Sequence, residues 1–149
     1  MPLNCVSSRL ATEHVREPVS AEGYAVASVA GLGEGWGIRK VRRALEVAEF
    51  GVNVIVMPPK YDAGPHLHET QEELYFVHEG EIEVLFHESE ARRLGPGGMA
   101  RVDAATVRRM RNVSDADAVI LIVGAKGGYI GRDGALPDGE FAPAGPITE

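Results

Sequence analysis

The residues best suited to chemistry lie close together near the middle of the chain. His66 and His68 are two residues apart, and Glu73 follows five residues after the second histidine. Residues two apart on a β-strand point to the same face, so a strand here would direct both imidazoles into one space. A turn at Thr70-Gln71 would return Glu73 to their side on the next strand. Two neutral nitrogens and one carboxylate form the ligand set that suits divalent iron and related metals.

This spacing resembles the first motif of the cupin superfamily, which reads His-x-His, four residues, Glu, six residues, Gly. His66, His68, Glu73 and Gly80 occupy those positions. The resemblance implies an all-β fold, a single cupin-type antiparallel β-barrel also described as a double-stranded β-helix or jelly roll, with its site inside. The alternative is a histidine-rich surface hairpin that binds no ligand.

The second cupin motif is only partly present. It requires Gly, Pro, Gly, His and Asn at positions that this chain fills with Gly97, Asp103, Ala105, Arg108 and Asn112, so that only the first and last match. The histidine of this motif is usually a fourth metal ligand in the family. A guanidinium in its place remains protonated and has no lone pair to offer a cation.

Three environments are open to an arginine at position 108, because a buried cation needs an anion or strong hydrogen bonds. Arg108 could pair with Glu73 in a barrel without metal. It could bind the carboxylate or phosphate of a small ligand in the bidentate geometry that arginine favours. The strand could also shift until Arg108 reaches solvent at the barrel mouth. Tyr75 has the strand parity of Glu73 and is a second candidate for substrate binding, as a hydrogen-bond donor.

The elements that must position these residues are mostly strands. Turn signals recur about every 8–12 residues along the middle of the chain, as an all-β barrel or sandwich requires. They lie at Gly64-Pro65, Gly80, Glu88-Ser89 and Gly95-Pro96-Gly97-Gly98. We expect strands at residues 24–30, 51–57, 74–78, 82–87, 99–103, 107–111 and 118–124, and a strand leading into a short helical turn within 36–49.

Length and composition bound the domain organisation and the location. A chain of 149 residues fits one domain with a sizeable core, so we expect a single cupin domain with its barrel at about 24–125. Residues 126–149 are rich in Gly and Pro and predict an irregular strap or a tail.

Cys5 is the single cysteine, which excludes an intrachain disulfide. No segment approaches the roughly 18 apolar residues of a membrane span, and we expect a cytoplasmic protein with no membrane partner.

The charges of the protein indicate which kind of molecule it can bind. The net charge of −7 makes nucleic acid a poor partner for the whole molecule. A metal near Arg108 would be repelled by several kcal/mol at about 4–6 Å in a partly dry site. A small acid bound between the two cations removes that cost, which favours a small anionic molecule as the partner.

Two main functions follow. The first is an enzyme with a divalent transition metal (iron, manganese, nickel or zinc) on His66, His68 and Glu73, and the resemblance implies an oxygenase or an isomerase. The second is a non-catalytic binding protein whose barrel holds an anion through Arg108, with Glu73 and Arg108 paired and no metal. A vestigial barrel that serves only as a dimer unit is a third interpretation. The resemblance also suggests a homodimer.

Overall fold

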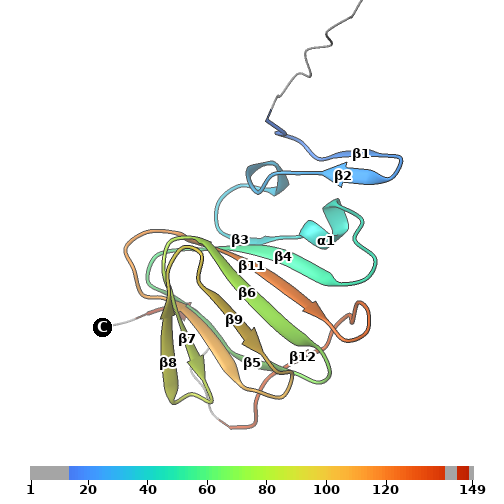
Figure 1. Ribbon diagram of the computed structural model, residues 1–149. Helices are drawn as coiled ribbons and strands as arrows, with labels where there is room; N and C mark the ends of the chain where they lie inside the picture. Colours follow the sequence, from blue (N-terminus) through green and yellow to red (C-terminus); the bar gives the residue numbers. More distant parts are fainter. Residues whose placement is uncertain (1–13, 140–143, 148–149) are drawn as a thin grey trace, which may run out of the picture.

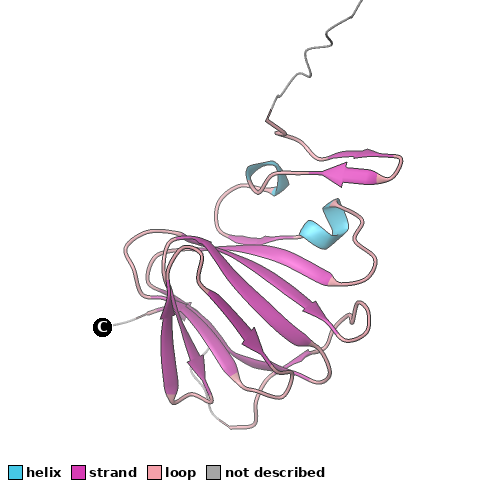
Figure 2. Ribbon diagram, viewed as in Figure 1, coloured by secondary structure: helices cyan, strands magenta, loops and turns pink. Residues whose placement is uncertain are grey.

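The computed structural model describes residues 14–139 and 144–147, which form two antiparallel sheets and a separate hairpin (Figure 1). The elements are β1 (Val19–Ala21), β2 (Tyr24–Val26), η1 (Ala30–Leu32), β3 (Gly37–Arg39), α1 (Val41–Ala44), β4 (Gly51–Met57), β5 (Tyr61–His68), β6 (Glu72–Glu79), β7 (Ile82–Phe86), β8 (Glu90–Leu94), β9 (Met99–Val102), β10 (Arg108–Asn112), β11 (Ala118–Ala125), β12 (Gly134–Ala135) and β13 (Gly145–Pro146). Strands dominate, as Figure 2 shows. None of the described helices is long and apolar enough to cross a membrane.

The first sheet has the strand order β3-β4-β11-β6-β9, and the second has the order β12-β5-β10-β7-β8 with β13 also beside β5. β1 and β2 pair only with each other. This arrangement is the all-β jelly roll that the sequence predicted, and every strand pair in it is antiparallel.

The hydrophobic core lies between the two sheets. Val77 of β6 and Ile120 of β11 contribute to it from the first sheet, and Val84 and Met110 contribute from the second. Along β6 the burial alternates, so that Glu73, Tyr75 and Val77 are buried while the residues between them are more exposed. Since successive side chains of a strand point to opposite faces, the pattern that builds the core also directs Glu73 and Tyr75 inward.

Some details of the predicted strands are wrong. The strand expected at 24–30 ends at Val26 and is followed by a 3-10 turn, because its only partner is the three-residue β1. Gly64-Pro65, expected as a turn, lies inside β5, where the positive φ of Gly64 (76°) accompanies a register shift against β10. Glycine there permits a β-bulge and not a reversal of the chain. The strand β8 was not anticipated.

The outer side of β10 carries two arginines that pair with carboxylates. Arg109 is buried and pairs with Asp62 and Glu88 at 2.9 Å and 3.1 Å. Arg111 pairs with Glu83 at 3.1 Å. The neighbouring strands place these carboxylates opposite the arginines. Sequence spacing within one strand does not predict this tertiary arrangement.

Asn112, a residue of the second motif, holds the ends of two strands together. Its side chain is fully buried, and its amide nitrogen donates to the backbone carbonyls of Met57, Pro58 and Ala116 at 2.8–3.2 Å. Its amide oxygen accepts from the backbone and the hydroxyl of Ser114. The asparagine therefore joins the end of β10 to the end of β4.

We predict that Asn112→Ala lowers the free energy of unfolding by about 3 kcal/mol, because buried carbonyls lose their donor. Urea unfolding monitored by fluorescence would measure the change. Ser114→Ala, which removes one hydroxyl from the same turn, is the matched control and should cost under about 1 kcal/mol. Equal stability of Asn112→Ala and the wild type would contradict this role.

Candidate metal centre

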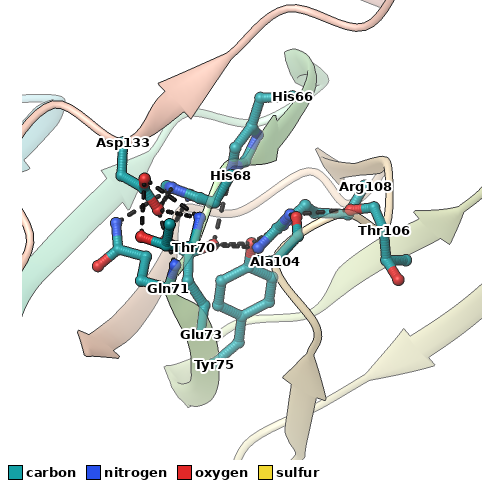
Figure 3. A network of polar contacts seen from close by, with 10 residues as sticks. All are labelled: His66, His68, Thr70, Gln71, Glu73, Tyr75, Ala104, Thr106, Arg108 and Asp133. Atoms are coloured by element: carbon teal, nitrogen blue, oxygen red, sulfur yellow. Dashed lines mark hydrogen bonds and ion pairs between the residues drawn. The ribbon is translucent and has the colours of Figure 1, made fainter. Parts of the chain in front are cut away.

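The structure brings His66, His68 and Glu73 together inside the barrel (Figure 3). The Nε2 atom of His68 lies 3.1 Å from Glu73 Oε1, and Nε2 of His66 lies 3.6 Å from Glu73 Oε2. One potential ligand atom from each residue lies within 4.8 Å of the others. The two imidazole rings are edge to face, with centroids 5.3 Å apart.

These side chains face one another across the barrel and not along a hairpin. β5, which carries both histidines, belongs to the second sheet, whereas β6, which carries Glu73, belongs to the first. The short connection between them crosses from one sheet to the other. Because His68 and Glu73 are buried, the alternative of a histidine-rich surface hairpin is wrong.

The donor set fits a divalent cation. The Nε2 atom of His68 is buried and has no hydrogen-bond partner among the described residues, although it faces the carboxylate of Glu73. Burial lowers the pKa of His68 below its ordinary value, so that the ring is neutral and keeps a lone pair for a metal. A buried nitrogen that lacks a partner is costly, and coordination of a metal would satisfy it.

The two oxygens of Glu73 have different surroundings. Oε2 accepts a hydrogen bond from the hydroxyl of Tyr75 at 2.7 Å and another from Nη2 of Arg108 at 3.1 Å. Arg108 Nε donates in turn to the Tyr75 hydroxyl at 3.2 Å, which closes a ring of three residues. Oε1 takes no part in this ring and faces His68. Hydrogen bonds therefore hold the carboxylate through Oε2, and Oε1 is left to bind a metal.

This environment keeps Glu73 ionised. Burial acts to raise the pKa of its carboxyl, but hydrogen bonding by the His66 imidazole and the Tyr75 hydroxyl, together with the nearby His68 ring and the charge of Arg108, outweighs burial and lowers the pKa to about 2. Burial and the neighbouring carboxylate both raise the pKa of Tyr75, so its hydroxyl keeps its proton. Tyr75 is thus a donor, and Glu73 is its acceptor.

Arg108 is completely buried, with 0% of its surface exposed. Besides its bonds to Glu73 and Tyr75, it donates through Nη1 to the carbonyls of Ala104 and Thr106 at 3.0 Å and 2.8 Å. Of the three environments open to it from the sequence, the solvent-exposed one is wrong and the pair with Glu73 is formed. Its binding of a ligand anion stays a prediction.

A cavity of about 620 Å³ adjoins the cluster, a size that suits a small organic molecule. Its wall is mostly apolar, with side chains such as Ile55, Met57, Met110 and Ile122. His66, His68, Glu73 and Tyr75 provide most of the polar groups of the wall, together with Asn53 and Tyr61. Among the described residues, no lysine or arginine lines this cavity.

Two polar residues of the site were missed from the sequence. The amide nitrogen of the Gln71 side chain lies 3.1 Å from Nδ1 of His68, on the ring edge away from Glu73. Asp133 Oδ2 lies 3.7 Å from the same nitrogen. Gln71 was counted only as part of a turn, and Asp133 lies in the Gly- and Pro-rich segment, where no spacing connects it to the histidines.

Comparison with known proteins agrees with this fold. Residues 53–124 match the family model described as the cupin domain. A structure described as a sugar phosphate isomerase from a cupin superfamily, from Silicibacter pomeroyi, aligns with a TM-score of 0.55 and 26% identity over 60% of this chain and 58% of that one. A DMSP lyase from Ruegeria pomeroyi aligns with a TM-score of 0.54 and 28% identity over 62% of this chain and 46% of that one.

A protein with a double-stranded β-helix domain from Klebsiella pneumoniae also aligns, with a TM-score of 0.54 and 21% identity over 61% of this chain and 76% of that chain, and it supports the fold alone. The chain spans less than two thirds of the length of the isomerase and of the lyase. A search of curated protein sequences finds no match.

The lowered pKa of Glu73 predicts a dependence of stability on pH in metal-free protein. Since the pKa is about 2 in the folded state and 4.5 ordinarily, the stabilisation is complete above pH 4.5 and is lost as the pH falls toward 2. At 1.36 kcal/mol per pKa unit it amounts to about 3 kcal/mol. Urea unfolding of the wild type and Glu73→Gln should therefore differ most above pH 4.5 and converge below it. A difference that stays constant from pH 7 to pH 3 would contradict the prediction.

Proposed function

The chain belongs to the cupin superfamily, and we propose that it is a metal-dependent enzyme whose barrel holds a divalent transition metal on His66, His68 and Glu73. The observation that carries this proposal is the buried Nε2 of His68, which has no hydrogen-bond partner within the described part of the chain and faces Oε1 of Glu73. Two imidazoles and one carboxylate accept iron, manganese, nickel or zinc. They leave coordination positions for water, oxygen or substrate.

A bound metal would supply Lewis acidity and a template for the substrate, the chemistry that oxygenases and isomerases share. The chain's own residues would prepare the site for it. Tyr75 and Arg108 hold Glu73 through Oε2, so that Oε1 is presented to the metal. The apolar wall of the cavity would exclude water around the substrate.

We propose a small organic anion with an apolar body as the substrate. With both histidines as metal ligands, which must be neutral, the anionic Glu73 and the cationic Arg108 sum to no net charge, so a divalent metal leaves an excess of positive charge that an anion would balance. Coordination of Glu73 by the metal would weaken its hold on Arg108. Arg108 does not line the cavity, so its Nη2 would attract a ligand carboxylate from behind Tyr75, whose hydroxyl it binds. Tyr75, which lines the cavity, would contact the same ligand.

The comparisons support a small-molecule substrate without naming it. Two similar structures are described as a sugar phosphate isomerase and a DMSP lyase. A phosphate is less well matched than a carboxylate, because its greater negative charge needs more cationic partners and no cationic side chain of the described residues lines the cavity. An isomerase or an oxygenase acting on a small organic acid is the function that these observations favour.

The second candidate is a binding protein without metal. The specific observation that favours it is the buried pair between Glu73 and Arg108 at 3.1 Å, which already neutralises the carboxylate. In this case the barrel would hold a small anion through Arg108 without a metal, and the histidines would only line the cavity.

A homodimer remains a further proposal. Exposed apolar side chains on the hairpin and on β3, including Tyr24 (62% exposed) and Ile38 (59%), support it because such surface is often covered by a partner. Light scattering at micromolar concentration would show a mass near twice 16.0 kDa, and a monomer would count against it.

Metal content tests the main proposal directly. Protein purified without chelator from metal-supplemented medium should carry about one transition metal per chain, since three ligands and open positions define one site. The double variant His66→Ala/His68→Ala should carry almost none. His78→Ala is the matched control, because the side chain of His78 is 62% exposed on β6 and should leave the metal content unchanged. A metal-free wild type, or a double variant with normal content, would reject the site.

Arg108→Met separates the two candidate functions. In the enzyme, the metal balances Glu73, so the loaded variant should fold, keep its metal and bind small carboxylates about tenfold more weakly or worse in a thermal-shift screen. In the binding protein, removal of the arginine frees Glu73, and metal uptake should rise above that of the wild type. Equal responses to organic acids in both proteins would rule out binding by Arg108.

A further inference from the structure

The edge of His68 that points away from Glu73 is enclosed by polar groups from a distant part of the chain. The carboxylate of Asp133, with a side chain only 4% exposed, accepts hydrogen bonds from the backbone nitrogens of Thr70 and Gln71 at 3.0 Å and 2.8 Å. The Thr70 backbone nitrogen also lies 3.2 Å from the other carboxylate oxygen, to which its hydroxyl donates at 3.1 Å. Asp133 thus closes the turn between β5 and β6.

The backbone around Asp133 is tied to the same strand end. β12 begins at Gly134, which pairs with His68, the last residue of β5. The backbone nitrogen of Glu69 donates to the carbonyl of Asp133 at 3.1 Å. In Figure 3, Asp133 and Gln71 lie on one side of His68 and Arg108 lies on the other. The segment that follows the barrel strands is therefore built into the wall behind a candidate metal ligand.

A histidine that coordinates a metal through Nε2 must carry its proton on Nδ1, and that proton needs an acceptor. Two polar groups face Nδ1 of His68. The carboxylate oxygen Oδ2 of Asp133 lies 3.7 Å away, and the side-chain amide nitrogen of Gln71 lies 3.1 Å away. A half-turn of that amide exchanges its nitrogen for an oxygen of nearly equal shape, which would then accept the Nδ1 proton.

We propose that Asp133 and Gln71 are positioning residues of the metal centre, which hold His68 in the orientation and tautomer that direct Nε2 toward the metal. This inference rests on the proposed function. Asp133 acts mainly through Gln71, whose backbone it anchors, and its negative charge favours a proton on the near edge of the ring. Partners of this kind typically change metal affinity by about 10–100-fold when they are removed.

Gly124 provides an independent means of disturbing the same contact. A Cβ atom at this position would lie 2.7 Å from Oε1 of Gln71, so a side chain there would displace the amide. Gly124 has no positive φ, and the β-strand backbone would accept alanine without strain. Gly124→Ala should therefore move the amide away from His68 while Asp133 stays in place.

The experiment measures the dissociation constant for cobalt(II) by competition with a chelator, on the full chain. Gln71→Leu, Gly124→Ala and Asp133→Asn should each weaken binding by about 10–100-fold. Thr70→Val is the matched control, because it removes one hydrogen bond to Asp133 from the same turn and leaves His68 untouched. It should stay within about twofold of the wild type. Gln71→Leu keeps the hydrogen bond from its backbone nitrogen to Asp133. It therefore tests whether the amide positions His68 even if Asp133→Asn does not fold.

A second readout separates positioning from loss of structure. The visible spectrum of the cobalt form depends on ligand geometry, and at saturating metal it should change in Gln71→Leu but not in Thr70→Val. Wild-type affinity and spectra in Gln71→Leu and Gly124→Ala would overturn this inference and leave the metal site standing. An affinity loss in Thr70→Val equal to that in Gln71→Leu would also overturn it. A wild type that binds no cobalt would overturn both the inference and the proposed function.

Discussion

The buried ion pair between Glu73 and Arg108 is the constraint on which the rest of the site depends. A carboxylate and a guanidinium taken out of water are tolerated only when each has strong partners. Tyr75 and two backbone carbonyls supply the remaining hydrogen bonds, so the guanidinium donates through all three of its nitrogens. Because this pair engages one oxygen of Glu73, it decides how the other oxygen can meet His68.

The substitution of arginine for a histidine changes the electrostatics of the centre more than its shape. A neutral fourth ligand would leave Glu73 as the single charge of the cluster. Arg108 cancels that charge before any metal arrives, which weakens the attraction for a cation and strengthens it for an anion. The same exchange explains why one structure supports a metal enzyme with an acidic substrate and also a metal-free binding protein. The balance depends on whether a metal can compete with the guanidinium for the carboxylate.

The positions of the three candidate ligands follow from how the two sheets are connected. β5 and β6 are consecutive in the chain but belong to different sheets, so the turn between them is a crossing point. Such a turn has no hairpin partner to fix it, and in this protein Asp133 holds it from outside. The described part of the Gly- and Pro-rich segment therefore has a structural role at the candidate metal centre, and its short strand β12 secures the end of β5.

By itself, the sequence determined the all-β fold, most of the barrel strands and the grouping of His66, His68 and Glu73, because alternation and motif spacing are local properties of the chain. For Arg108 it left three environments open, namely a pair with Glu73, the anion of a ligand, and solvent at the barrel mouth. Only the tertiary structure decided that Glu73 is the partner, since two sheets must meet before the strands that carry them can approach. Asp133 could not be found in advance for the same reason, because it lies 63 and 62 positions from Thr70 and Gln71, whose backbone it binds, and no periodicity of a strand encodes such a distance. Gln71 is close to His68 in sequence, but only the folded turn brings its amide to the ring.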